Sequence, residues 1–560
     1  MVALTAGDPV APVLLLHPIE AAGAMHRRGV MGMDGGTLPE ETGALEQAFA
    51  AFYRILDTIL TAGYGCDLGD EGYLADLGDV EDGMLRVGAM RYPVVAVPPA
   101  ATWRPHTFAL LRDFAARGGT LLFIGDPPTE LDGVPSDDWL ALLARARHIS
   151  DDPEQLWQSL DAVVPHCFTL RGCDGAPVPH TYINHRRDGT AETLFITNSD
   201  DDAVREYVLT WLGDASPSLT RWEPIDGSSA RINQGCRTYR FSLPPNGSLL
   251  LTAGAEEEAL PVYTPITLEG TEVAAAPREW AFTRSEPNVL VLDRMAVTVD
   301  DEAWPELSVW KVIGRLNSHF GLTGVERFQP WTLARDDRYT GAGGPVTIRQ
   351  QFTCAMMPET AALVFDGIVP DALHVNGTPV SLARAGWHWD RAMRAVPVTD
   401  ALRVGENVVE FHAHYDRMTE MCATSLIGDF AVRLEADGRG TVVPEPVTLT
   451  GAPWTEQGYP YYSGAIRYRT TVTGADHSLY LRLADPVAVL VRVAVNDLAL
   501  SPLMWSPFET ALPCRPGDNV IELNVVSSRQ NTWYFRRDAS GCPMLHPYGL
   551  GPVEILAASK

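Results

Sequence analysis

Aromatic side chains gather with polar neighbours at several places in the second half of the sequence. The densest run spans residues 386–390, where Trp387 and Trp389 flank a histidine and Asp390 follows. Sugar rings stack their C–H faces on aromatic rings, and their hydroxyls take directional polar partners. We therefore predict carbohydrate contacts, or alternatively packing in β-sandwich cores, for these clusters. The predicted contact residues are Trp387, Trp389, Asp390, Trp454, Tyr461, Tyr462, Trp505, Asn531 and Trp533.

Catalytic carboxylates cannot be selected by spacing. Glycosidases need two carboxylates about 5–10 Å apart around the scissile bond, and the chain has 71 acidic residues. Asp67, Asp70 and Glu71 follow a predicted strand, where α/β folds often place ligands, but helix capping is the alternative. The catalytic residues therefore stay unknown at this stage.

Histidines and acids form two further candidate groups. His17, Glu20 and His26 lie at a predicted strand end and could form a metal or acid–base cluster, unless His17 belongs to a turn. A second group follows the strand that starts at Gly405, where it could reach a ligand or mark a surface strand end; its members are His412, His414, Asp416, Arg417 and Glu420. No loop has the spacing of a calcium site. We predict no metal site and no cofactor.

The sequence lacks the motifs of several common kinds of catalytic and binding site. No G-x-G-x-x-G or P-loop follows a predicted strand, and the glycine-rich run 32–36 matches neither. No G-x-S-x-G indicates a serine hydrolase, and no C-x-x-C indicates a zinc ribbon or a thioredoxin-like centre. Lysine occurs only at Lys311 and Lys560, which leaves little room for lysine chemistry.

The charge balance is strongly acidic. A net charge of -28 repels phosphate backbones and anionic membranes, so we predict no nucleic-acid and no membrane partner. The acidic charge does not exclude neutral ligands. The first residues lack a basic segment followed by an apolar core, which predicts a cytoplasmic protein, and the eight dispersed cysteines favour reduced thiols.

The elements that must position these residues fall into two classes. Up to about residue 150, short apolar runs at 12–16, 92–97 and 121–124 alternate with helical patterns at 43–61 and 107–117. This rhythm predicts a doubly wound sheet. From about 165 onward, alternating segments and Asn-Gly or Asp-Gly turns predict antiparallel strands. The acidic run 256–258 separates this β-region from the next.

Two related units follow this link. In the first, a V-N-G turn at Asn376 is followed by tryptophans and by G-E-N-V-V-E from Gly405; in the second, V-N-D at Asn496 is followed by Trp505 and by G-D-N-V-I-E from Gly517. Asn and Gly accept positive φ in the tight turns that join strands. The recurrence predicts duplicated jelly-roll sandwiches.

These motifs resemble those of the galactose-binding-like domains of bacterial glycoside hydrolases. They are similar to the sugar-binding domains of family 2 type enzymes and to large α-L-rhamnosidase-like proteins of the family 106 type; segments 425–432, 454–464 and 549–553 extend the resemblance. Upstream, segments 14–20, 66–71 and 92–99 look like the flavodoxin-like domain of those proteins, which is similar to a β-galactosidase trimerisation domain.

The resemblance implies a multidomain α/β plus all-β fold. Its parts are a flavodoxin-like α/β domain at 1–164, a small antiparallel β-sandwich at 165–255, and galactose-binding-like jelly-roll β-sandwiches at 262–445 and 446–560. In those proteins a (β/α)8 barrel with the catalytic carboxylates precedes the flavodoxin-like domain, and no stretch here offers eight strand–helix repeats.

The resemblance therefore predicts the sugar-binding, accessory half of a rhamnosidase-like enzyme. The ligand would be an oligosaccharide or glycoside, and further partners would be a separately encoded barrel or copies of the same chain. A purely structural assembly module, or a glycosidase with a site between domains, are the alternatives that stay open.

Overall fold

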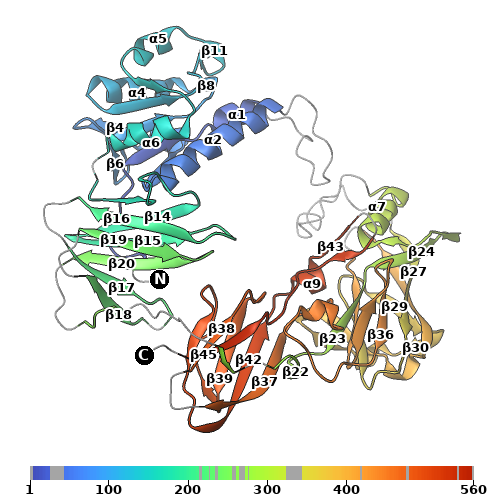
Figure 1. Cartoon of the computed structure of the whole chain (residues 1–560). Coiled ribbons are helices and arrows are strands. Elements are labelled where there is room, and N and C mark those ends of the chain that lie inside the picture. The colour runs from blue at the N-terminus through green and yellow to red at the C-terminus, as the bar shows by residue number, and fades with distance from the viewer. Residues whose placement is uncertain are drawn as a thin grey trace. The chain divides into compact units, whose positions relative to one another are not determined.

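The computed structural model divides the chain into two compact units, Met1–Ile266 and Thr267–Lys560 (Figure 1). The first combines a parallel sheet and helices with antiparallel strands, and the second is built from antiparallel sheets. The predicted fold class, α/β followed by all-β, is confirmed. The structure describes residues 4–25, 43–164, 166–212, 217–225, 227–233, 237–254, 260–263, 272–274, 277–322, 343–416, 419, 421–474, 479–538 and 541–557.

A parallel five-stranded sheet forms the centre of the α/β part of the first unit. Its strand order is β12–β9–β7–β2–β3. The bounds are β2 Val13–Leu16, β3 Cys66–Gly69, β7 Val94–Val97, β9 Thr120–Ile124 and β12 Arg147–Ile149. Strands β2 and β7 are buried along their whole length, as expected for parallel strands that are covered on both faces.

Helices cover both faces of this sheet. Because side chains alternate along a strand, Val13 and Leu15 pack in one core with α2 (Gly43–Thr61) and α6 (Pro153–Asp161). Leu14 and Leu16 pack in the other core with α3 (Glu71–Leu77), α4 (Pro105–Ala116) and α5 (Asp138–Leu143). This is the doubly wound arrangement that the sequence predicts. The remaining elements here are α1 Ile19–Met25, β4 Gly78–Glu81, β5 Met84–Val87, β6 Met90–Tyr92, β8 Thr102–Trp103, β10 Glu130–Leu131 and β11 Val134–Pro135.

Two antiparallel sheets complete the first unit and share one core. The larger has the order β1–β14–β15–β20–β17–β18, with β1 Asp8–Pro9, β14 Thr181–Asp188, β15 Ala191–Asn198, β20 Ser248–Gly254, β17 Ser218–Trp222 and β18 Ser229–Asn233. The smaller has the order β13–β16–β19, with β13 Phe168–Arg171, β16 Arg205–Trp211 and β19 Thr238–Leu243. Their buried faces meet around Leu194, Ile196 and Tyr207. Strand β1 precedes the parallel sheet in sequence yet pairs with β14, so the chain crosses between the two parts at its start.

The first sandwich of the second unit has one long and one short sheet. The short sheet is β23 (Asn288–Leu292), β34 (Thr424–Gly428), β28 (Ala361–Phe365), β32 (Asp390–Pro397) and β31 (Gly386–His388). The long sheet runs β25 (Glu302–Ala303), β24 (Arg294–Val299), β27 (Gly344–Cys354), β33 (Gly405–Tyr415), β29 (Pro370–Val375) and β30 (Thr378–Val380), and it also holds β26 (Leu307–Ser308), β35 (Ala431–Leu434) and β36 (Gly440–Val443). Helix α7 (Val309–His319) packs against the same core.

The second sandwich takes strands from both ends of the second unit. One sheet is β21 (Glu272–Ala274), β45 (Val553–Ala557), β38 (Leu479–Leu483) and β41 (Glu509–Leu512); the other is β22 (Ala281–Arg284), β37 (Ala465–Gly474), β42 (Gly517–Val526), β39 (Leu490–Val495) and β40 (Leu498–Ala499). The sequence-based boundary assigns 262–445 to the first sandwich, whereas strand pairing places β21 and β22 in the second. The first sandwich is therefore an insertion between β22 and β37.

A C-terminal excursion joins the two sandwiches. After β42 the chain forms α9 (Gln530–Trp533), β43 (Arg536–Arg537) and β44 (Pro543–Met544), seen in red beside the yellow strands of the first sandwich in Figure 1. Arg537 makes a two-pronged ion pair with Asp293, both contacts at 2.6 Å. The excursion then returns to β45 in the second sandwich.

The two sandwiches repeat one asparagine pair. Asn376 and Asn496 have positive φ, 53° and 49°, in the turns that the sequence predicts. Asn376 Nδ2 donates to Asn407 Oδ1 at 2.9 Å, and Asn496 Nδ2 donates to Asn519 Oδ1 at 2.8 Å. Asn407 and Asn519, which open the two long strands β33 and β42, are completely buried. The sequence repeat is therefore a repeat of buried polar contacts.

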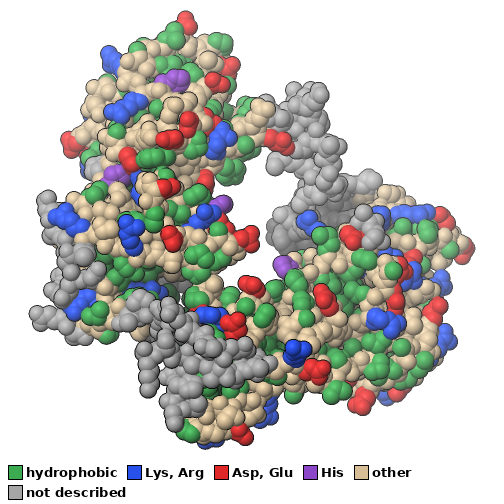
Figure 2. Space-filling view, in the orientation of Figure 1, with side chains coloured by type: hydrophobic (Ala, Val, Ile, Leu, Met, Phe, Trp, Pro, Cys, Tyr) green, Lys and Arg blue, Asp and Glu red, His purple; other side chains and the backbone are tan. Residues whose placement is uncertain are grey.

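Surface and membrane properties follow the composition. Acidic and basic side chains are interspersed on each unit over the face shown in Figure 2. No helix within the described residues is long and apolar enough to cross a membrane. No disulfide joins any of the seven cysteines that lie in the described ranges.

Candidate functional site

A strained hairpin presents the central tryptophan of the candidate site. Strands β31 and β32 pair His388 with Asp390, so Trp389 alone forms the turn, at φ 64°. A bulky side chain rarely adopts the left-handed region, and such strain collects at functional sites. Asp390 Oδ1 stabilises the hairpin by accepting the Ala392 N–H at 2.8 Å.

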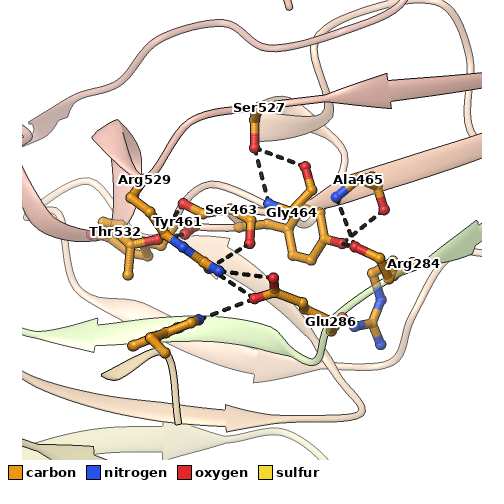
Figure 3. A network of polar contacts seen from close by, with 12 residues as sticks. Arg284, Glu286, Tyr461, Ser463, Gly464, Ala465, Ser527, Arg529 and Thr532 are labelled. Atoms are coloured by element: carbon orange, nitrogen blue, oxygen red, sulfur yellow. Dashed lines mark hydrogen bonds and ion pairs between the residues drawn. The ribbon is translucent and has the colours of Figure 1, made fainter. Parts of the chain in front are cut away.

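Glu286 fixes the direction of the Trp389 indole. It lies in the short segment 285–287 that links β22 to β23, and its Oε2 accepts the Trp389 Nε1–H at 3.1 Å. Arg529 donates to both carboxylate oxygens of Glu286, at 2.8 Å each (Figure 3). This paired geometry is the strongest that a guanidinium and a carboxylate form. Both partners are about a third exposed, so the pair also faces solvent.

Arg529 also organises the aromatic rings. Its guanidinium carbon lies 5.4 Å from the Trp389 ring centroid and 5.9 Å from that of Trp533. The two indoles meet edge to face, with centroids 5.9 Å apart and an interplanar angle of 83°. We call Glu286, Trp389, Arg529 and Trp533 the tryptophan cluster. It unites a hairpin of the first sandwich with the C-terminal excursion.

A buried network of hydrogen bonds holds Arg529 of the cluster in place. Arg529 Nη1 donates to the Ser463 carbonyl at 2.9 Å, and the Ser463 hydroxyl bonds that of Thr532, which in turn donates to the Tyr461 carbonyl at 2.8 Å (Figure 3). Ser463 and Thr532 are almost completely buried. Satisfied buried networks hold their members in one arrangement, so the Arg529 side chain has a defined position.

The nine predicted contact residues divide into an exposed and a buried group. Four of them are completely buried: Trp454, Tyr461, Tyr462 and Asn531. The remaining five keep accessible surface: Trp387, Trp389, Asp390, Trp505 and Trp533. A sugar ring can stack only on an accessible face, so only the second group offers surface to a ligand.

The buried group has packing and bracing roles. Trp454 packs between Tyr462 and Tyr548 in the core of the second sandwich. Tyr461 points into the first sandwich and contacts Phe535. Asn531 holds the backbone of His546 from both sides, since its amide donates to the carbonyl at 2.9 Å and accepts the N–H at 2.8 Å. The core-filling alternative raised for the aromatic clusters is what the structure shows for these side chains.

The exposed group is only partly assembled. Trp389 and Trp533 are in contact, and Trp387 projects from β31 two residues before Trp389 with 61% of its side chain exposed. Trp505 lies between β40 and β41 in the second sandwich, and none of the ring contacts found within the described residues joins it to the cluster. The structure thus brings two predicted residues together and leaves Trp505 apart.

The cluster offers stacking faces beside a fixed ion pair. His388 contacts Trp389 with the ring planes tilted by 55° and the centroids 4.7 Å apart. Desolvation lowers the pKa of His388, so this imidazole is neutral near pH 7. The site therefore has aromatic faces, one carboxylate and one guanidinium. Such a set suits an uncharged polyhydroxylated ligand better than an ion.

Comparison with solved structures finds glycoside hydrolases. The chain is similar to a rhamnosidase from Novosphingobium sp. PP1Y, with 16% identity over 99% of this chain and 39% of that chain, at a TM-score of 0.43. It is also similar to an apo exo-carrageenase, GH42, from Bacteroides ovatus, with 11% identity over 44% of this chain and 29% of that chain, at a TM-score of 0.28. A β-galactosidase from Bacillus circulans sp. alkalophilus matches with 12% identity over 45% of this chain and 42% of that chain, at a TM-score of 0.26.

The chain spans about two fifths of the length of that rhamnosidase. No protein-family profile matches the sequence, and no curated protein sequence matches it.

Glu286 and Arg529 are the two cluster members that the predicted residue set lacks. Glu286 stands in a Ser-Glu-Pro segment without any motif, and its partners are far away in sequence. Arg529 does lie in the aromatic run 529–534. A charged residue next to a predicted aromatic cluster is the signal that could have pointed to Arg529, whereas Glu286 had none.

Two carboxylate candidates of the α/β part hold helix ends in place. Asp70 caps α3, because its Oδ1 accepts the N–H groups of Gly72 at 2.8 Å and Tyr73 at 3.1 Å. Glu71 is buried and accepts the Arg104 N–H at 2.8 Å and the Thr107 hydroxyl at 2.5 Å, at the start of α4. The capping alternative therefore describes Asp70, whereas Glu71 ties the start of α3 to the start of α4.

The other sequence candidates of this part are engaged locally. Asp67 accepts the Tyr92 hydroxyl at 2.8 Å, Glu20 pairs with Arg104 at 2.5 Å, and His17 contacts the Phe52 ring. His26 and the glycine run 32–36 lie outside the described residues, as do Arg417 and Glu420.

Two hollows in the second unit are separate from the tryptophan cluster. One, of about 480 Å³, is polar and lies on the first sandwich, lined by residues that include Gln351, Glu406, Glu435 and Arg439. The other, of about 380 Å³, lies on the second sandwich between glycine- and proline-rich loops. Neither is lined by a predicted contact residue.

Proposed function

We propose that the second unit binds carbohydrate through the tryptophan cluster, as the accessory part of a glycoside-hydrolase-type protein that resembles α-L-rhamnosidases. One observation carries the proposal. Trp389 is held in a left-handed turn with its indole N–H on Glu286, beside the half-exposed Trp533. Core packing does not require a strained turn at a partly exposed surface.

The exposed faces suit stacking on a sugar ring. Trp533 on α9 is 41% exposed, and Trp387 on β31 is 61% exposed. Covering an exposed apolar face stabilises a complex by about 25 cal/mol per Å² of area removed from water. A sugar ring that covers such a face would recover that free energy.

The ion pair supplies polar specificity. Arg529 and Glu286 neutralise each other, so the site attracts neither cations nor anions strongly, and their outer edges can still bond hydroxyl groups. The buried network under Arg529 fixes these edges before a ligand arrives. Pre-organisation of this kind lowers the entropy cost of binding.

We further propose the partners that the sequence motifs imply. The ligand is an oligosaccharide or glycoside. A catalytic barrel on another polypeptide would supply hydrolysis, or copies of this chain would associate through the α/β domain. The proposed compartment is the cytoplasm.

Calorimetric titration of the full chain tests the binding proposal. The titrants are oligosaccharides that end in α-L-rhamnose or β-galactose. We expect saturable binding that Trp533→Ala and Trp387→Ala weaken about 10- to 100-fold, the loss of one stacked face. Trp310→Ala is the matched control, because Trp310 on α7 of the first sandwich is at least as exposed as Trp533 and Trp387, and its loss should leave the affinity unchanged.

Two results would contradict the proposal. If a broad glycan array shows no saturable binding, the unit is a structural assembly module. If the purified chain hydrolyses an aryl α-L-rhamnoside or β-galactoside, the accessory role is wrong and a catalytic site is present in the chain itself.

A further inference from the structure

Three metal-ligating side chains meet on the outer face of the first sandwich. Glu410 and His412 are two residues apart on β33, so both project to the same face. His374 lies directly opposite Glu410 on the neighbouring strand β29. One donor atom from each of the three side chains lies within 4.8 Å of the other two.

We propose that His374, Glu410 and His412 bind a divalent transition metal ion of the zinc class. Imidazole nitrogen and carboxylate oxygen are ligands that zinc accepts, and two histidines with one glutamate leave a fourth position for water or a ligand. His412 Nε2 already lies 2.7 Å from Glu410 Oε1, and the two histidine rings are perpendicular with centroids 5.3 Å apart. A small shift of the rings would let an ion replace the His412–Glu410 contact.

The neighbours of these ligands form a suitable outer shell. Thr347 Oγ1 lies 3.2 Å from His412 Nδ1, so that with Nε2 on the metal the Nδ1–H would donate to the hydroxyl. Arg349 Nε donates to Glu410 Oε2 at 2.5 Å and leaves Oε1 for the metal. Metal-bound histidines and carboxylates are commonly oriented by such second contacts.

An unpaired nitrogen of His374 favours a metal site over a simple ion pair between Glu410 and His412. Nδ1 of His374 is buried and has no hydrogen-bond partner among the described residues. Buried polar atoms are nearly always paired, so the unpaired nitrogen of His374 calls for a partner that the protein itself does not supply. In the tautomer with its proton on Nε2, the Nδ1 lone pair of His374 would be available to a metal ion.

A second group of ligating side chains is less suited to the same ion. Cys167, His185 and Glu192 also cluster in the first unit, where Glu192 contacts His185 and Arg187 at 2.7 Å each, the same pattern of partners that Glu410 has. Burial raises the pKa of the Cys167 thiol, and a metal needs the thiolate. This cluster is therefore an internal competitor that the experiment has to exclude.

Metal titration of the chelator-treated full chain tests the proposal, with Zn²⁺ in calorimetry and Co²⁺ in absorption spectroscopy. We expect one site, with Co²⁺ bands that lack thiolate charge transfer. His412→Ala and His374→Ala should weaken Zn²⁺ binding more than about 100-fold, and Thr347→Val about 10-fold as the loss of an outer contact. Thermal unfolding of each variant without metal shows that the fold is kept.

His414→Ala is the matched control. His414 lies on the same strand and the same outer face but outside the cluster, so its removal should leave the Zn²⁺ affinity unchanged. The proposal is overturned if the wild-type chain binds no Zn²⁺, or if the His374→Ala/His412→Ala double variant keeps wild-type affinity. It is equally overturned if Cys167→Ser abolishes binding, since the metal then occupies the competitor cluster.

Discussion

Replacement of Asn519 by alanine should destabilise one sandwich selectively. The Asn519 amide lies completely buried where β42 begins. Its Nδ2 donates to the carbonyls of Arg515 at 2.7 Å and Gly517 at 2.8 Å, and its Oδ1 accepts the Arg515 N–H at 3.0 Å and the Asn496 Nδ2–H at 2.8 Å. Asn519→Ala removes all four contacts and leaves their partners behind.

The magnitude follows from the groups that stay unpaired. A buried polar group that loses its partner costs about 1–3 kcal/mol. The Arg515 and Gly517 groups lie in a turn that is open to water and can rehydrate, whereas the Asn496 amide loses its acceptor under the strand. We therefore expect the free energy of unfolding to fall by about 3 kcal/mol, a large part of the 5–15 kcal/mol typical of a domain.

Hydrogen exchange measured by mass spectrometry locates the effect. Exchange should accelerate in peptides of β37, β39 and β42, which pair with one another, and should stay unchanged in β27 and β29 of the first sandwich. Asn407→Ala is the matched variant, because Asn407 makes the equivalent contacts at the start of β33. It should produce the reverse pattern.

A double variant tests the link between the paired asparagines. Asn496 and Asn519 share one hydrogen bond, so Asn496→Ala combined with Asn519→Ala should cost about 1 kcal/mol less than the sum of the single changes. Urea unfolding of the four proteins gives this coupling. A loss below about 1 kcal/mol for Asn519→Ala, or equal acceleration of exchange in both sandwiches, would refute the reasoning.

Two further predictions concern the first unit. Asp70→Ala removes the cap of α3 and should lower the free energy of unfolding by about 1 kcal/mol in urea titration, whereas Asp70→Asn should keep most of it. Desolvation lowers the pKa of His185 below its ordinary value of 6.5, although Glu192 opposes the shift. The unfolded chain then binds a proton below about pH 6.5 that the folded chain does not, so stability is highest above that pH and falls as the pH decreases. His185→Gln should flatten this fall in urea titrations between pH 7 and pH 5, and an unchanged slope would contradict it.

Local patterns predicted those parts of the fold that depend on neighbours in sequence. Val13–Leu16 is apolar at every position and became a strand that is buried on both faces. Asn376 and Asn496 were recognisable as turn residues because few residue types accept positive φ cheaply. Such signals act within a few residues, so sequence alone carries them.

Long-range pairing was beyond those patterns. Strand β22 alternates like any other, and nothing in its residues specifies that Ala281 pairs with Arg469 in the second sandwich. The boundary at residue 262 therefore assigned it to the wrong sandwich. Strand partners depend on the complete set of buried faces, which a local reading does not contain.

The sequence predicted where the aromatic clusters are, but it could not separate a binding surface from a buried core. Trp389 and Trp454 have similar polar neighbours in sequence, yet one is held at the surface by Glu286 and the other is completely buried. Tryptophan satisfies a core and a binding surface by the same apolar area. Only the three-dimensional position of Glu286 and Arg529 separates the two cases.

The insertion of the first sandwich between β22 and β37 has a consequence for the order of folding during synthesis. Strand β22 leaves the ribosome long before its partner β37, so β22 has no partner strand until the whole insert has been synthesised. The inserted sandwich solves this by its own folding, since Arg284 at the end of β22 pairs with Glu445 just beyond the last strand of the insert at 2.7 Å. Once the insert has folded, its two ends lie side by side, and the loop that β22 and β37 have to close is effectively short. The second sandwich is thus completed after the first has folded. A truncation inside the first sandwich should therefore prevent both sandwiches from folding.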